Sequence, residues 1–148
     1  LRTGDLGARL AGEVYILGRT KEMIIVRGAN FYPTDLEEAV AAAHPAIEGS
    51  AVAAFAAQRD GAEGVVLALE IRREMRKTPL DDIRKAATRA LVEAFDIRPL
   101  DVVVLRPSGM LRTSSGKIRR TEMAAGYRAG DLLVWPGDGA GETGTTPA

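Results

Sequence analysis

The spacing of apolar and polar positions predicts a small fold that mixes strands and helices. Two apolar runs, 50–57 and 64–71, are separated by a polar stretch at 58–61, which predicts neighbouring strands joined by a turn. A third short strand is predicted at 101–105. Because these runs are short and bounded by polar or glycine-containing stretches, strands are favoured over buried helices.

Capping signals and helical spacing predict three helices. Thr34 begins the first, with Glu37 three residues on as the reciprocal partner of a capping box. Thr78 offers a capping hydroxyl, followed by proline at the first helical position, for a longer helix whose apolar positions recur as far as Phe95. A short helix is predicted near 121–127.

The first part of the chain predicts a separate hairpin. The apolar run 13–17 is expected to pair with 23–26 across the turn 18–22, and residues 1–7 form a loop rich in glycine. The expected architecture is therefore α/β (α+β): a small mixed sheet of about three strands flanked by helices, plus an N-terminal β-hairpin.

Composition limits the classes of function. The 148 residues are 46% hydrophobic and 27% charged, which fits one globular domain. The net charge is zero, so no overall field favours nucleic acid, and no apolar run is long enough for a membrane span. The chain has no cysteine and one histidine, His44, which excludes disulfides and a histidine metal site and is compatible with a cytoplasmic setting. Leu1 begins in mid-pattern, so we expect a longer parent chain.

Lys117 is the first candidate for chemistry. It follows Ser114-Ser115-Gly116 on a polar segment, where a mobile cation could reach a negatively charged transition state. A solvated basic loop is the alternative interpretation of the same residues. A phosphate-binding P-loop is excluded, because too many residues separate Gly109 from the glycine before the lysine, and Ile118 replaces the required Ser or Thr.

Asp5 and Arg19 form a second candidate pair. A carboxylate accepts hydrogen bonds from a ribose diol and a guanidinium donates several, so together they suit a nucleotide sugar. Each is equally compatible with a surface position, as is the turn lysine Lys21. Phe31 and Tyr32, beside a proline, are interpreted either as packing residues or as ligand contacts.

Three motifs, in this order, carry a resemblance to a known superfamily. They are Leu1-Arg2-Thr3-Gly4-Asp5, Gly18-Arg19-Thr20-Lys21 and Arg112-Thr113-Ser114-Ser115-Gly116-Lys117. Taken jointly they resemble the C-terminal domain of adenylate-forming enzymes, which include acyl- and aryl-CoA synthetases, peptide synthetase adenylation domains, luciferases and fatty acyl-AMP ligases.

The resemblance implies a role for each matched residue. Asp5 is expected to hold the ribose hydroxyls of ATP, and Arg19 to meet the ribose and phosphate region. Lys21 is expected to be the hinge about which the domain rotates. Lys117 is expected to contact the carboxylate and the α-phosphate during adenylation, with Mg²⁺ bound mainly by a large N-terminal domain that the sequence does not contain.

The residues after the second motif are most similar to fatty acyl-AMP ligases. They are 25–28, Asn30, Tyr32-Pro33 and 35–37, while Ala29 stands where these ligases often carry arginine. This resemblance implies a long-chain fatty acid as substrate and the phosphopantetheine arm of an acyl carrier protein as acceptor, with Gly28, Asn30 and Tyr32 on the face that meets it.

The motifs divide the chain into three parts. Residues 1–17 are expected to close the large domain and include the first hairpin strand, 18–135 to form the mobile C-terminal domain, and 136–148 to be a Gly/Thr-rich linker. Alone, such a chain is expected to lack ligase activity. The alternatives are the same domain of an acyl-CoA or aryl-CoA synthetase, and a non-catalytic module that docks a carrier protein.

Overall fold

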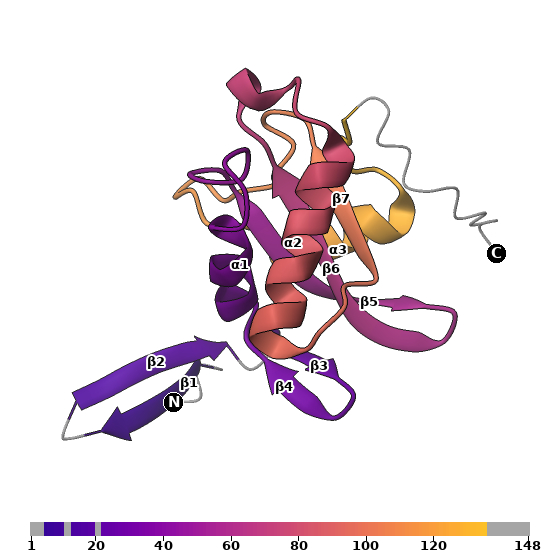
Figure 1. Ribbon diagram of the computed structural model, residues 1–148. Helices are drawn as coiled ribbons and strands as arrows, with labels where there is room; N and C mark the ends of the chain where they lie inside the picture. The colour runs from indigo at the N-terminus through magenta and orange to yellow at the C-terminus, as the bar shows by residue number, and fades with distance from the viewer. Residues whose placement is uncertain (1–4, 11–12, 20–21, 136–148) are drawn as a thin grey trace.

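A computed structural model describes residues 5–10, 13–19 and 22–135 as three helices, a 3₁₀ turn and seven strands (Figure 1). Along the chain they are β1 (Asp5–Leu10), β2 (Glu13–Arg19), β3 (Ile24–Val26), β4 (Ala29–Phe31), α1 (Pro33–Ala41), β5 (Val52–Arg59), β6 (Ala62–Glu70), η2 (Arg73–Met75), α2 (Leu80–Phe95), β7 (Asp101–Leu105) and α3 (Arg120–Ala129).

The central sheet has three strands in the order β5-β6-β7. β5 and β6 are antiparallel and form a hairpin, whereas β6 and β7 are parallel and are connected through α2. The expected small mixed sheet with flanking helices is therefore confirmed.

Alternating side chains of the sheet form two apolar layers. One layer joins the sheet to α1 and α2 and includes Leu36, Ile83 and Leu91. The other joins the opposite face to α3 and includes Phe55 and Met123. β6 contributes to both layers in alternation, and this explains why its sequence is a continuous apolar run rather than a two-residue alternation.

A second hairpin, β3–β4, packs at one end of the sheet. Its two-residue turn, Arg27-Gly28, has positive φ at both positions, 50° and 79°, as a type I′ turn requires. Phe31 lies edge-on to Phe95 of α2, with ring centroids 6.0 Å apart. This aromatic contact fixes the hairpin to the α2 side of the domain (Figure 1).

The predicted pairing of 13–17 with 23–26 is wrong. Asp5–Leu10 is a strand rather than part of a loop, and it pairs with β2 in the antiparallel sense, while β3 pairs with β4. β3 and β4 are joined by the two-residue turn Arg27-Gly28, whose conformation matches the twist of paired strands better than the longer stretch 18–22 would. A hairpin is thus present, but with different partners.

The predicted capping box at Thr34 is also wrong. α1 begins at Pro33 with Tyr32 at the N-cap, and no side chain caps it. Glu37 binds elsewhere, as described below. α2 begins at Leu80, with Pro79 at the N-cap and no hydroxyl cap, so its predicted start is displaced by one residue. Pro33 at the first position of α1 has a φ suited to the helix and lacks an N–H that would otherwise need a partner. Pro79 occupies the N-cap of α2 with a φ of −57° and a ψ of 126°.

The last described segment protects the outer edge of β7. Val134 bridges to Leu105, and Trp135 donates its backbone N–H to the carbonyl of Val104 at 2.9 Å. Trp135 also packs against the layer that contains α2, which makes this single tryptophan a reporter of unfolding. Among the described helices none is long and apolar enough to cross a membrane.

We predict that stability falls between about pH 10 and pH 12 because of Tyr127. Burial, with a hydrogen bond of 2.9 Å to Asp101, raises the pKa of Tyr127 to about 12. An unfolded tyrosine ionises near pH 10, so the folded state binds the proton more tightly, and this contribution is complete below pH 10 and lost as pH rises towards 12.

Urea unfolding followed by Trp135 fluorescence at several alkaline pH values, together with absorbance titration of tyrosinate, measures this effect. The Tyr127→Phe variant should be less stable near neutral pH and should show a flatter decline across the same window. An equal decline in both proteins would assign the effect to other groups.

Candidate functional site

Lys117 lies in a short turn held by its own hydrogen bonds. The Thr113 N–H donates to the Lys117 carbonyl at 2.8 Å, and the Gly116 N–H donates to the Thr113 carbonyl at 2.9 Å. Gly116 has a φ of 89°, which favours glycine, and Arg112 bridges to Ile118 at the base of the turn. The backbone of this polar segment is therefore folded, and the side chain of Lys117 is exposed.

Two contacts anchor this turn to the body of the domain. The N–H of Met110 donates to a carboxylate oxygen of Glu70, at the end of β6, at 2.9 Å. The next N–H, of Leu111, donates to the buried sulfur of Met123 in α3, and the Arg119 N–H returns to the Leu111 carbonyl at 3.0 Å. The two ends of the turn are thus connected to each other, and each is attached to α3: Leu111 through Met123, and Arg119 as the N-cap of the helix.

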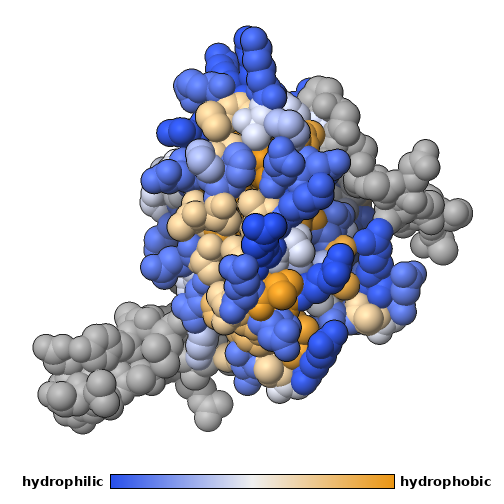
Figure 2. Space-filling model, in the orientation of Figure 1, coloured by the Kyte–Doolittle hydropathy of each residue, from blue (hydrophilic) through white to orange (hydrophobic). Residues whose placement is uncertain are grey.

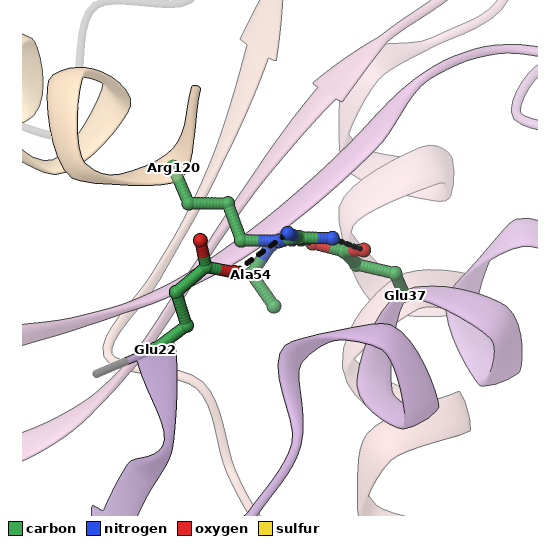
Figure 3. Close-up of polar contacts among 4 residues, drawn as sticks. All are labelled: Glu22, Glu37, Ala54 and Arg120. Atoms are coloured by element: carbon green, nitrogen blue, oxygen red, sulfur yellow. Dashed lines mark hydrogen bonds and ion pairs between the residues drawn. The ribbon is translucent and has the colours of Figure 1, made fainter. Parts of the chain in front are cut away.

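Arg120 begins α3 and joins three separate segments (Figure 3). Its Nε and Nη2 each donate to an oxygen of Glu37 in α1 at 2.6 Å, and its Nη1 donates to Glu22 at 2.9 Å. Glu37 also accepts the N–H of Ala54, on β5, at 2.9 Å. Three side chains from distant parts of the sequence therefore meet in one ion cluster, Glu22–Glu37–Arg120.

The cluster is largely shielded from solvent. The side chains of Arg120 and Glu37 are 17% and 12% exposed, and that of Glu22 is 31% exposed. The hydrogen bonds to Glu37 raise the pKa of Arg120 above its usual value, against the opposing effect of burial. The guanidinium is therefore charged at every pH at which the fold persists, and its planar fork matches both oxygens of Glu37.

Sequence reasoning did not find this cluster. Glu37 was expected to be a capping residue, and neither Glu22 nor Arg120 was singled out as a partner. The one available signal was an arginine directly after a candidate loop, which by itself is typical of a solvated basic run. Its partners lie 83 and 98 residues away in the sequence, so local patterns carry no information about them.

The backbones of the candidate pair Asp5 and Arg19 lie next to each other in the structure. Asp5 and Arg19 are register partners at the open end of the β1–β2 hairpin. The expected contacts of these two side chains with a nucleotide stay a prediction. Lys21 lies outside the described residues.

The three candidate acceptor-face residues lie on or beside the β3–β4 hairpin. Gly28 is in its turn and Asn30 is in β4, both exposed, and Tyr32 follows at the start of α1, half-buried. Figure 2 shows apolar surface in the region where this hairpin meets the end of α2. Ile25 in β3 and Val92 in α2 are 49% and 42% exposed. The hairpin contacts α2 through Phe31 and Phe95, whereas the turn of Lys117 is anchored to α3, which packs in the other apolar layer.

The described residues do not provide a metal centre. No group of three or more His, Asp or Glu side chains in that part of the chain is arranged to hold an ion. Lys117 contributes an exposed ammonium group on a folded turn.

Known proteins of similar sequence indicate the class of protein to which this domain belongs. The chain is 35% identical over 136 residues to the medium-chain-fatty-acid--[acyl-carrier-protein] ligase JamA of Moorena producens, covering 91% of this chain and 23% of that relative. It is 37% identical over 134 residues to the long-chain-fatty-acid--AMP ligase FadD26 of Mycobacterium marinum, covering 87% of this chain and 22% of that relative. The chain therefore spans less than a quarter of the length of these relatives.

Solved structures agree with the sequences. A fatty acyl-adenylate ligase structure, from a study of the E. coli and L. pneumophila enzymes, superposes with a TM-score of 0.70 at 32% identity, over 88% of this chain and 22% of that one. The structure of McyG A-PCP complexed with phenylalanyl-adenylate gives a TM-score of 0.72 at 27% identity, over 86% of this chain and 23% of that one.

The layered fold and these neighbours are those of a domain found in adenylate-forming enzymes, which confirms the resemblance seen in the sequence motifs. A family model matches residues 21–135, and the chain belongs to that family, described as Disco-interacting protein 2-like, AMP domain.

We predict that Arg120→Met destabilises the chain by about 2–3 kcal/mol, because it leaves the carboxylates of Glu22 and Glu37 close together without their cation. Arg119→Met is the matched control, since the neighbouring Arg119 pairs with Glu122 at an exposed site and should cost less than about 0.5 kcal/mol. Urea unfolding monitored by Trp135 fluorescence compares the two variants. Equal costs would show that the Glu22–Glu37–Arg120 cluster contributes no more than a surface ion pair.

Proposed function

We propose that this chain is the C-terminal domain of a fatty acyl-AMP ligase, which adenylates a long-chain fatty acid with ATP and transfers the acyl group to an acyl carrier protein. The observation that carries the proposal is the placement of Lys117 on a folded, exposed turn in a chain whose relatives are named as fatty acid ligases. In this proposal the large N-terminal domain is a further part of the enzyme.

In the first half-reaction, a carboxylate oxygen of the fatty acid attacks the α-phosphorus of ATP. The bond from the α-phosphorus to the bridging oxygen breaks, and pyrophosphate leaves with that electron pair. Lys117 donates hydrogen bonds to the carboxylate and the α-phosphate as negative charge gathers there, which stabilises the transition state more than the ground state. Asp5 holds the ribose hydroxyls and Arg19 contacts the ribose and phosphates.

In the second half-reaction, the thiol of the phosphopantetheine arm attacks the acyl carbonyl and AMP leaves. The domain, residues 18–135, rotates about Lys21 between the two steps, so that the region of Gly28, Asn30 and Tyr32 replaces the turn of Lys117. This division of roles is supported by the hairpin packing against α2 through Phe31, whereas the turn of Lys117 is anchored to α3 in the other apolar layer. Residues 1–17 end the large domain and 136–148 serve as a linker.

Magnesium accompanies ATP in this scheme. Because the described residues offer no metal cluster, no step is assigned to an ion held by this chain. The ion's ligands belong to the large domain in this proposal.

The choice of acceptor tests the proposed function. The full-length protein is incubated with ATP, Mg²⁺ and a series of fatty acids, and with either CoA or a phosphopantetheinylated carrier protein, and the acyl thioesters are measured by mass spectrometry. We expect acylated carrier protein and no acyl-CoA. Acyl-CoA as the main product would assign the domain to a CoA synthetase, and absence of acyl-AMP would favour a non-catalytic docking module.

We further predict that Lys117→Ala in the full-length protein lowers the rate of adenylation by about 100- to 1000-fold, because one donor to the transition state is lost. Transfer from preformed acyl-AMP should change little, since Lys117 is withdrawn in that step. Pyrophosphate exchange and single-turnover transfer measure the two half-reactions, with Lys85→Ala on the exposed side of α2 as the control. Equal losses in both half-reactions would contradict alternation.

A further inference from the structure

The Glu22–Glu37–Arg120 cluster connects the start of the mobile domain to the turn of Lys117. Glu22 directly follows Lys21, the proposed hinge, and Arg120 comes three residues after Lys117. Arg120 spans these two segments with hydrogen bonds of 2.6 and 2.9 Å to Glu37 and Glu22 (Figure 3). A side chain in the first position of α3 thus reaches the segment at which the domain begins.

The position of α3 determines the position of the turn. The N–H of Leu111 donates to the sulfur of Met123 one turn into the helix, and the N–H of Met123 donates to the carbonyl of Arg119. The N–H of Arg119 in turn donates to the carbonyl of Leu111. Because these bonds close a loop between the base of the turn and α3, a displacement of the helix start displaces Lys117 as well.

The geometry of the cluster requires arginine rather than any cation. Two parallel hydrogen bonds to Glu37 fix the plane of the guanidinium, and a third nitrogen then points at Glu22. Glu37 is itself fixed by the N–H of Ala54. A lysine would retain the charge but could not make the bidentate contact and reach Glu22 in the same plane.

We propose that Arg120 is a positioning residue for adenylation, which holds the turn of Lys117 in register with the segment that begins at Glu22. The inference rests on the proposed function of Lys117 and adds a new role for its neighbour. α1, which carries Glu37, directly follows the hairpin with Gly28, so the cluster also ties the candidate acceptor face to the same rigid unit. The proposed hinge rotation then moves the turn of Lys117 and the hairpin that contains Gly28 together.

A double-mutant cycle in the full-length protein tests whether Arg120 acts through Lys117. Arg120→Lys should lower kcat for pyrophosphate exchange by about 10- to 100-fold, because a misplaced catalytic group costs that much. KM for ATP should change little. In a Lys117→Ala background the same Arg120→Lys change should have no further effect, since residues that act as one unit are not additive.

Two comparisons separate positioning from a general loss of structure. Transfer of the acyl group from preformed acyl-AMP should survive Arg120→Lys, whereas a damaged domain would lose both half-reactions. Arg119→Lys is the matched control, because this adjacent arginine pairs only with Glu122 at an exposed site among the described residues, and it should leave both rates unchanged. Additive losses in the cycle, or equal losses in the two half-reactions, would overturn the proposal.

Hydrogen exchange tests the connection independently of fatty acid chemistry. In the full-length protein, Glu22, which is 31% exposed, is changed to Gln, a substitution outside the bidentate Arg120–Glu37 contact. Amide exchange in 111–119, particularly at the N–H groups of Thr113 and Arg119, should become faster in Glu22→Gln and in Arg120→Lys. Unchanged exchange in both variants would overturn the connection between the hinge side and the turn.

The two measurements distinguish failure of this inference from failure of the proposed function. If the wild-type protein forms no acyl-AMP from any fatty acid, the proposed function fails, while hydrogen exchange still decides whether Glu22 and the turn are connected. If the wild-type protein is active and the cycle is additive, the proposed function stands and the role of Arg120 is rejected.

Discussion

The contact between Arg120 and its two carboxylates is the constraint on which the arrangement of this domain depends. The apolar layers bring α1 and α3 onto opposite faces of one sheet, but side chains packed against a sheet leave the helices some freedom to slide. A guanidinium fixed by two hydrogen bonds to Glu37 has much less freedom, because both distance and plane are specified. The cluster therefore fixes the relation between segments that packing alone would leave loose.

The free-energy cost of burying the Glu22–Glu37–Arg120 cluster explains why its groups are joined by so many hydrogen bonds. Removing three charged groups from water is unfavourable, and it is offset only if their hydrogen bonds are satisfied. Glu37 accepts from Arg120 through both oxygens and also accepts the N–H of Ala54, on the edge strand of the sheet. The same carboxylate thus balances the arginine and satisfies a backbone donor that a neighbouring strand would otherwise pair with.

The sequence predicted the elements of the fold well and their partners less well. Apolar runs identified β5, β6 and β7 because these strands are bounded by clear turns, and Lys117 could be selected because its motif is local. Strand pairing near the N-terminus was predicted incorrectly, since a choice between turns depends on φ values such as that of Arg27, which no pattern of hydropathy reveals. The role of Arg120 could not be predicted either, because its partners lie 83 and 98 residues away and are brought to it only by the tertiary fold.

In the proposed function one domain serves two half-reactions, which requires it to combine motion with rigidity. Rotation about a hinge presents a distant side chain correctly only if the body that rotates does not deform, because small errors of angle grow with distance from the pivot. Lys117 is exposed and its ammonium group can adjust, but its backbone is held by Thr113, and the base of its turn by Met123. In the proposed rotation, an exposed side chain on a folded turn that is connected through Arg120 to the segment beginning at Glu22 would reconcile a large movement with accurate placement.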